Sequence, residues 1–204
     1  MPKSVPRNIK SMVLVKVRCW GSKDPLHLEY HEKEWGTPSH DDRFLFEHVV
    51  LEGFQAGLSW GTILKKREAF RKAFDGFDIA KVAVYGEADV ARILSSEGII
   101  RNRRKMESAI NNAKRVAEVQ GEFGSFERYI WGFTGGKTIQ HRLKDFAEMP
   151  TESDESRAMS ADMKRRGFTF VGPTSCYAFM QAVGMINDHL THCFRHAELS
   201  ATKR

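Results

Sequence analysis

The sequence contains few cysteines and no long apolar run. Three cysteines among 204 residues are an odd and sparse set, which does not suggest a disulfide framework and favours a reducing cytosolic location. No stretch approaches the roughly 18 apolar residues that a membrane helix needs, so we expect no membrane partner. Sustained alternation of polar and apolar residues is also missing, as are internal repeats. We therefore predict an all-α fold.

The composition is that of a globular protein. Hydrophobic residues make up 41% of the chain and charged residues 28%, and 204 residues suit one large domain or two small ones. The net charge of +6 favours a polyanionic partner. We predict a flexible basic arm at residues 1–17, one helical domain at 18–196, a tail at 197–204 and a monomer. The arm lacks the apolar core and cleavage site of a signal peptide.

Capping residues and apolar spacing locate the helices. Asp41 or Asp42, Ser59, Asp78, Ser125 and Ser153 or Asp154 are all side chains that start helices well. Helices are predicted at residues 26–35, 42–52, 60–74, 78–86, 87–98, 101–120, 125–133, 154–167 and 173–186, with a loop at 134–152. The last of these helices is expected to be long and buried, beginning at Pro173.

The stretch LEGFQAGLSW (residues 51–60) combines an acid with an indole. Glu52 ends an apolar helical pattern, small residues form a turn, and Ser59 caps a new helix whose first turn carries Trp60. One corner would then present a hydrogen-bonding carboxylate and a flat stacking wall, as a ligand pocket requires. The alternative at this point is that Glu52 is solvated and Trp60 belongs to the core.

A basic hairpin follows the fifth predicted helix. The turn Gly98-Ile99-Ile100 precedes four cations, Arg101, Arg103, Arg104 and Lys105. Free backbone N–H groups at a helix N-terminus beside basic side chains form a ready phosphate site. The alternative is an ordinary helix connection with a solvated basic face.

Four potential metal ligands lie in two pairs at opposite ends of the chain. Cys19 and His31 form one pair, and His189 and Cys193 form the other, with a spacing that would put both on one helical face. If the pairs meet, they make a closed Cys2His2 zinc site, which would be structural because a catalytic zinc keeps an open position. The alternative is two reduced cysteines and surface histidines, and His192 and His196 compete as ligands.

The aromatic residues near the N-terminus form a further constellation. Trp20, Tyr30, Trp35 and Trp60 cluster in the sequence around the polar residues His27, Glu29, His31 and Glu52. Such mixing is unusual for a plain core and favours a pocket in which a base stacks on aromatic rings.

Together these segments resemble the type I 3-methyladenine DNA glycosylases, a branch of the helix-hairpin-helix DNA glycosylases. The matching residues are DPL at 24–26, YHEKEWG at 30–36, LEGFQAGLSW at 51–60 followed by TILKKRE, GIIRNRRK at 98–105 and KRRGFTFVGPTSCYAFMQAVGMINDH at 164–189. The similarity extends from about Arg18 to His196 and its motifs are long and ordered. It implies a helical glycosylase domain with a zinc site that ties its N- and C-terminal regions together.

The resemblance also implies roles for individual residues. Glu52 matches the pocket acid that recognises a flipped base, Tyr30 and Trp60 match the pocket aromatics, and Trp20 and Trp35 match aromatics near its wall. The implied ligands of one structural zinc ion are Cys19, His31, His189 and Cys193, and the implied DNA-binding hairpin covers Gly98 to Lys105. His27 and Phe54 are also predicted to contact the substrate, although the family commonly has tyrosine and glutamine at these positions. The segment between Cys19 and Asp24 is one residue shorter than in the family.

The expected reaction follows from the chemistry of the lesion. A 3-methylated adenine is cationic, so its glycosidic bond is already weak and the pocket mainly discriminates and stabilises charge. No lysine stands out as a Schiff-base nucleophile, which predicts hydrolysis to a free base and an abasic site in alkylated double-stranded DNA, without strand cleavage. The alternatives are a glycosylase for another alkylated base, a zinc-containing DNA-binding module without catalysis, and a metal-dependent hydrolase.

Overall fold

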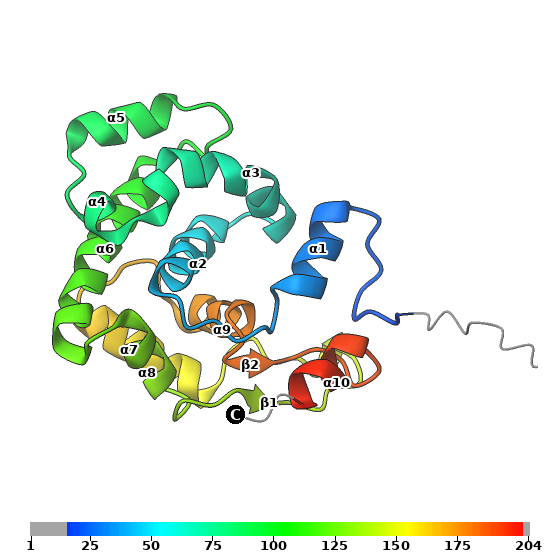
Figure 1. The fold of residues 1–204 in the computed structure, drawn as a ribbon. Coiled ribbons are helices and arrows are strands. Elements are labelled where there is room, and N and C mark those ends of the chain that lie inside the picture. The colour runs from blue at the N-terminus through cyan, green and yellow to red at the C-terminus, as the bar shows by residue number, and fades with distance from the viewer. Residues whose placement is uncertain (1–15, 202–204) are drawn as a thin grey trace, which may run out of the picture.

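Helices account for most of the residues that the structure, a computed structural model, describes, namely 16–201. They are α1 (Pro25–Lys33), α2 (Asp42–Gln55), α3 (Trp60–Ala73), α4 (Ile79–Ala83), α5 (Glu87–Ser95), α6 (Arg103–Phe123), α7 (Phe126–Gly132), α8 (Asp154–Arg165), α9 (Pro173–Ala182) and α10 (Phe194–Ala201), with short 3-10 turns at Asp75–Phe77 and Phe146–Glu148. All nine predicted helices are therefore present, and α10 is an addition (Figure 1).

Side-chain caps set most of the helix starts. Asp41 accepts from the backbone N–H of Phe44 at the start of α2, and Ser59 accepts from Thr62 at the start of α3. The same device begins further helices at Asp24, Asp78, Asn102, Ser125 and Ser153. Each cap satisfies a backbone donor that the helix itself leaves free.

Helix α2 lies in the middle of the fold. It contacts α3, α6, α7 and α9, and Figure 1 shows these helices around it. Its core side chains Leu45, Phe46 and Leu51 are completely buried. A helix surrounded in this way has no solvent-facing stripe, so a polar residue on it, such as Glu52, is buried as well.

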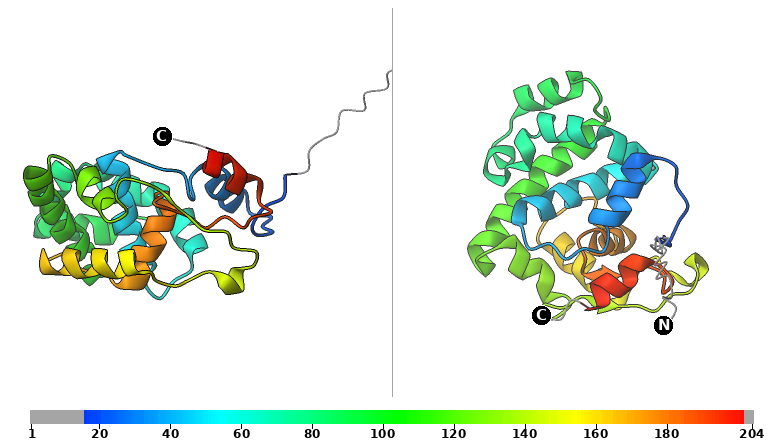
Figure 2. Two further views of the ribbon diagram at one scale, coloured as in Figure 1. Left: turned by 90° about the horizontal axis from the view of Figure 1, so that it is seen from below. Right: turned by 45° about the vertical axis from the view of Figure 1, so that its right-hand side comes forward.

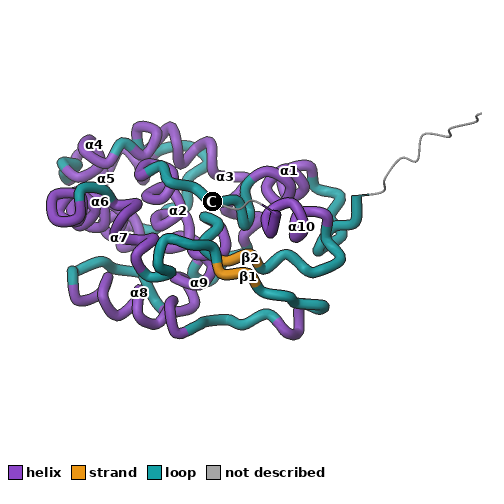
Figure 3. Tube along the Cα trace, turned by 60° about the horizontal axis from the view of Figure 1, so that its bottom comes forward, coloured by secondary structure: helices purple, strands orange, loops and turns teal. Residues whose placement is uncertain are grey.

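Two corrections concern the end of α9 and the loop predicted at 134–152. Helix α9 ends at Ala182 instead of Ile186, because Gly184 has a φ of 78° and a Cβ there would lie 2.2 Å from the backbone nitrogen of Pro38. The chain instead forms strand β2 (Ile186–Asn187), which pairs in parallel with β1 (Ile139–Gln140) inside the predicted loop (Figure 3). The fold is thus helical with one short two-stranded sheet.

The two ends of the described chain lie together. The N–H of Phe194, the first residue of α10, donates to the carbonyl of Val17 at 3.0 Å, and α10 overlaps α1 in the left view of Figure 2 but lies below it in Figure 1. Arg195 donates to the hydroxyl of Thr37 at 2.6 Å. The tail predicted at 197–204 is helical as far as Ala201. Residues 1–15 of the predicted basic arm fall outside the described residues. No helix in the described range has the length and apolar character to cross a membrane.

Candidate functional site

The corner between α2 and α3 brings three of the predicted pocket residues together. Glu52 lies on the last turn of α2 with a relative exposure of 6%, and Trp60 is the first residue of α3. Tyr30, from α1, is also buried, and its ring centre lies 5.2 Å from that of Trp60. The capping of α3 by Ser59 fixes the direction of the indole, because the cap sets the first turn of the helix.

The polar groups of this corner are buried without partners. The Glu52 carboxylate makes no hydrogen bond or ion pair with the part of the chain that the structure describes, and burial raises its pKa to about 8. The indole Nε1 of Trp60 is likewise buried without a partner. Burial also raises the pKa of Tyr30, with a smaller contribution from the charge of Glu52, so these two groups are close.

A cleft of about 260 Å³ opens beside Glu52. Its lining residues are Glu52, Gln55, Ala56, Gly57, Leu58, Thr174, Ser175 and Ala178, so it runs between the corner and the start of α9. A second, more enclosed pocket shares Glu52 and Ser175 with this cleft and continues past Cys176 and Phe170. Ser175 is a lining residue that the sequence did not single out. Ser175 could have been recognised as a polar residue in the first turn of the helix predicted to begin at Pro173.

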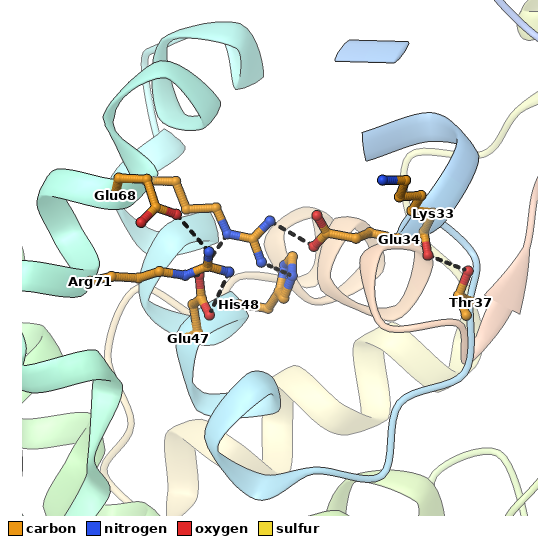
Figure 4. Close-up of polar contacts among 8 residues, drawn as sticks. Lys33, Glu34, Thr37, Glu47, His48, Glu68 and Arg71 are labelled. Atoms are coloured by element: carbon orange, nitrogen blue, oxygen red, sulfur yellow. Dashed lines mark hydrogen bonds and ion pairs between the residues drawn. The ribbon is translucent and has the colours of Figure 1, made fainter. Parts of the chain in front are cut away.

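A buried network of ion pairs supports the corner from behind. The guanidinium of Arg67 donates to Glu47 and to Glu34, both at 2.6 Å, and Arg71 donates to Glu47 at 2.9 Å (Figure 4). These residues join α2, α3 and the end of α1, the three segments that carry Glu52, Trp60 and Tyr30. Arg67 is itself buried, and the sequence did not predict this network.

His48 belongs to the same network. Its ring stacks against Trp60 with centres 6.2 Å apart, and its Nε2 lies 3.5 Å from Arg67. Burial, followed by the charges of Arg67 and Arg71, lowers the pKa of His48 well below its usual value. The imidazole is therefore neutral at pH 7, and it adds no positive charge behind the Trp60 ring.

Two predicted pocket residues occupy different places. The ring of His27 lies against the first turn of α3, where a Cβ on Gly61 would be 2.6 Å from its Nε2. Phe54 is in the core instead of the cleft, with 1% exposure and its ring 4.6 Å from that of Phe70. Phe54 and Glu52 are two residues apart on one helix, about 200° around its axis, so they face opposite ways.

Trp20 and Trp35 pack around the Cys/His group. The Trp20 ring lies 4.6 Å from His31, and the Trp35 ring lies 4.6 Å from His189. Both belong to an apolar cluster that also contains Tyr30 and Trp60. They thus connect the metal-ligand group to the corner and do not line the cleft.

The four predicted ligands converge although their pairs are far apart in sequence. One ligand atom from each of Cys19, His31, His189 and Cys193 lies within 4.8 Å of the others, and all four side chains are buried. The sulfur of Cys19 is 3.3 Å from Nδ1 of His189, and the sulfur of Cys193 is 3.5 Å from Nε2 of His31. Tetrahedral zinc requires S···N separations of about 3.5 Å, so this donor set fits a zinc ion.

Neighbouring groups prepare the ligands for a metal. Nε2 of His189 lies 2.9 Å from the carbonyl oxygen of Trp35, which fixes the ring with Nδ1 toward the sulfurs. A hydrogen bond from Cys19 is the main influence that lowers the pKa of Cys193, and His189 and His31 add to it. This favours the thiolate, the form that binds metals.

The expected helical spacing of the second ligand pair is wrong. His189 and Cys193 lie in the turns between β2 and α10, and α10 begins only at Phe194. The pair still converges because the chain folds back there, with the N–H of Cys193 donating to the carbonyl of Leu190. Neither His192 nor His196 belongs to the converging set.

The cations of the predicted basic hairpin divide into two groups. Arg101 and Arg104 are exposed and make no hydrogen bond or ion pair with the described residues. Arg103 instead pairs with Glu87 at 2.7 Å. Gly98, in the turn of this hairpin, has a left-handed backbone with a φ of 79°, and its carbonyl accepts from Lys66.

Ile99 and Lys105 of this hairpin are buried. The ammonium of Lys105 donates to the carbonyl oxygens of Phe54 at 2.9 Å and Ala56 at 2.6 Å, at the C-terminal end of α2. Lys105 therefore does not have the exposed position of a phosphate contact. It ties the hairpin helix α6 to the corner that carries Glu52.

Comparison with known proteins identifies close relatives of this chain. A profile described as methyladenine glycosylase matches residues 20–196. The DNA-3-methyladenine glycosylase of Haemophilus influenzae is 43% identical over 177 residues, covering 86% of this chain and 96% of that protein. DNA-3-methyladenine glycosylase 1 of Escherichia coli is 45% identical, with coverages of 86% and 95%. A crystal structure of 3-methyladenine DNA glycosylase I superposes with a TM-score of 0.84 at 46% identity, covering 87% of this chain and 98% of that one.

Proposed function

The chain belongs to the methyladenine glycosylase family and is a DNA repair glycosylase for 3-methyladenine, and we propose that it hydrolyses the glycosidic bond of this base after flipping it into the Glu52 cleft. The products are the free base and an abasic site in double-stranded DNA. The observation that carries the proposal is a buried carboxylate that lines a cleft, with a buried indole N–H on the same corner between α2 and α3, both without partners in the described chain.

The positive charge of the lesion complements the negative charge of an ionised Glu52. With a pKa of about 8, Glu52 is mostly protonated at neutral pH while the cleft holds no cation. A positively charged base beside it favours the ionised carboxylate, which can then accept from the exocyclic amine of the base. Adenine is neutral and provides no such charge. Ionising the buried Glu52 beside adenine would therefore cost free energy that no attraction to the base offsets.

The aromatic rings of the corner discriminate in the same direction. The rings of Tyr30 and Trp60 attract a cation over their faces, each by roughly 0.5–2 kcal/mol. A protonated His48 stacked behind Trp60 would oppose this attraction, and its lowered pKa keeps it neutral. The glycosidic bond of the cationic base is already weak, so charge recognition supplies much of the selectivity.

We assign hydrolysis without strand cleavage. A lyase needs a free amine at the sugar carbon, and no lysine lines the cleft. The lysine beside the corner, Lys105, is held by two backbone carbonyls. Water is therefore the nucleophile, which gives a monofunctional glycosylase.

The Cys2His2 group is proposed to hold one structural zinc ion. Cys19, His31, His189 and Cys193 would provide all four ligands, leaving no open position for substrate. When bound, the ion links the segment before α1 to the turn before α10. Elemental analysis of the purified protein is expected to find one zinc per chain, and a chelator is expected to lower the unfolding temperature.

The hairpin between α5 and α6 is proposed as a helix-hairpin-helix that contacts the DNA backbone. Arg101 and Arg104 are exposed there without partners in the described chain, as phosphate contacts require. We propose that the protein acts as a monomer.

The position of His27 favours a second candidate function. The His27 ring occupies the space left by the missing side chain of Gly61, next to Trp60 in the sequence, and this could extend the lesion range to another alkylated base.

Base release from alkylated duplex DNA tests the proposal. Wild-type protein is expected to liberate 3-methyladenine and leave alkali-labile abasic sites, and Glu52→Gln is expected to lower the rate by roughly 100-fold because the carboxylate charge is lost. Glu118→Gln, a change of an exposed acid on α6, is the matched control and should leave the rate unchanged. Absence of release by wild type would overturn the function, and equal rates for both variants would overturn the role of Glu52.

A further inference from the structure

One exposed aromatic side chain beside the cleft has no role in the chemistry above. Phe170 lies in the loop between α8 and α9, is 36% exposed and has a φ of 57°. The left-handed region is unfavourable for a bulky side chain, and such a conformation persists only where its surroundings enforce it. The loop thus holds a strained residue with its ring partly in solvent.

Side chains of α6 and α8 hold this loop in place. Asn112 clamps the residue before Phe170, because its Oδ1 accepts from the N–H of Thr169 at 2.9 Å and its Nδ2 donates to the Thr169 carbonyl at 3.0 Å. Ser108 lies 2.6 Å from the Thr169 hydroxyl, and Ser160 donates to the carbonyl of Val171 at 2.6 Å. The residues on either side of Phe170, Thr169 and Val171, are therefore held in place. The loop needs no further ordering to hold the Phe170 ring in this position.

The position of Phe170 relates it to the corner. It lines the enclosed pocket that shares Glu52 and Ser175 with the cleft, and a Cβ on Gly53 would lie 3.4 Å from its own Cβ. Lys164, which follows the pocket residue Met163 in the sequence, is exposed and makes no hydrogen bond or ion pair with the described chain. The partly exposed ring of Phe170 thus lies beside the corner that carries Glu52.

We propose that Phe170 stacks on a base of the lesion-containing duplex, next to the gap that the flipped nucleotide leaves. This inference rests on the proposed function. Flipping removes one base from the stack, and an aromatic ring that is already fixed can replace part of the lost stacking. Every base has an apolar face, so the contact would strengthen binding at the lesion without selecting a sequence.

A fluorescent duplex tests the contact directly. The duplex carries a tetrahydrofuran abasic analogue flanked by 2-aminopurine, whose emission reports its stacking. Phe170→Ala and Phe170→Gly both remove the ring, and glycine accepts the positive φ without strain, so at least one variant keeps the fold. Phe123→Ala is the matched control, because Phe123 is equally exposed, at 36%, but its ring packs against Tyr129, with ring centres 5.2 Å apart.

The expected result separates stacking from a structural role. Both Phe170 variants should bind the abasic duplex roughly tenfold more weakly and lose the 2-aminopurine change, as expected for loss of one stacked base. Binding of free 3-methyladenine, followed by intrinsic fluorescence, should stay unchanged. The proposal is overturned if duplex binding and emission match the Phe123→Ala control, or if free-base binding falls equally. A wild-type protein that binds the duplex but releases no base would overturn the proposed function alone.

Discussion

The Cys/His group and the Glu52 corner are both buried, yet only the first has its polar atoms directed at one another. In the Cys/His group, four ligand atoms from opposite ends of the chain lie within 4.8 Å, and a backbone carbonyl orients His189. In the corner, the carboxylate of Glu52 and the Nε1 of Trp60 have no partner in the described chain. The two sites share one apolar cluster through Trp35 and Tyr30.

The difference indicates what each site takes as its ligand. An unpaired buried polar group costs about 1–3 kcal/mol, so a fold keeps such groups mainly where a ligand supplies the partner. The Cys/His group has the size and donors for a single ion. The corner combines an acceptor, a donor and two flat rings, which suit a planar base. This contrast supports our proposal that the first site serves stability and the second serves recognition.

The largest effect is expected from removing a metal ligand. Cys193→Ser should lower the unfolding temperature by more than about 10 °C, since metal binding free energy contributes to folding free energy. Base release measured well below that temperature should be retained. Thermal unfolding and release assays on the same preparations check both statements, with Cys176→Ala as the control for losing a buried thiol. Loss of release without loss of stability would instead make the metal catalytic.

The corner is expected to show the opposite response, a gain of stability. The pKa of Glu52 rises from 4.5 to about 8 on folding, so the unfolded chain releases its proton first and stability falls as pH rises through this window. Glu52→Gln removes the penalty and should stabilise the protein by roughly 4–5 kcal/mol at pH 8.5, with little difference at pH 4. Thermal unfolding of both proteins at the two pH values measures this. A destabilised variant at pH 8.5 would mean that the carboxylate has a partner.

A smaller loss is expected at the link between the hairpin and the corner. Lys105→Met keeps the length of the side chain but leaves the carbonyls of Phe54 and Ala56 without their donor, which should cost about 2 kcal/mol. Chemical denaturation measures the free energy of unfolding. Were Lys105 a phosphate contact as predicted from the sequence, stability would stay constant and only the salt dependence of DNA binding would change.

The smallest effect distinguishes the cations of the hairpin. Arg104→Ala should weaken DNA binding and reduce the slope of log K against log salt by about 1, because one phosphate contact is lost. Arg103→Ala should change the slope less, since Arg103 is already paired with Glu87. Binding titrations over a range of salt concentrations compare the two. Equal slopes for both variants would show that the Glu87 pair opens on DNA.

Local signals predicted the helices well, because a cap acts within three residues. Asp41, Ser59 and Ser153 begin helices as expected. The end of α9 was missed because it depends on the close approach of Gly184 to Pro38, a contact between distant segments. Strand β1 was missed for the same reason, since its partner lies 47 residues further along the chain.

The candidate site was predictable where residue types identify the chemistry. Glu52, Trp60 and the four Cys/His ligands could be named from the sequence, but their geometry could not, and the expected helical pairing of His189 with Cys193 was wrong. The Arg67 network was missed because three segments contribute to it. Phe54 could have been assigned to the core, since helical geometry places it opposite Glu52.

The absent side chain at position 61 has an evolutionary consequence. A methyl group there would come within 2.6 Å of the His27 imidazole, which lies at the end of a flexible side chain and can move. Positions 27 and 61 therefore form an epistatic pair, in which a larger residue at 61 is tolerated only with a relocated or smaller partner at 27. A search for variants with an altered lesion range should therefore vary both positions together.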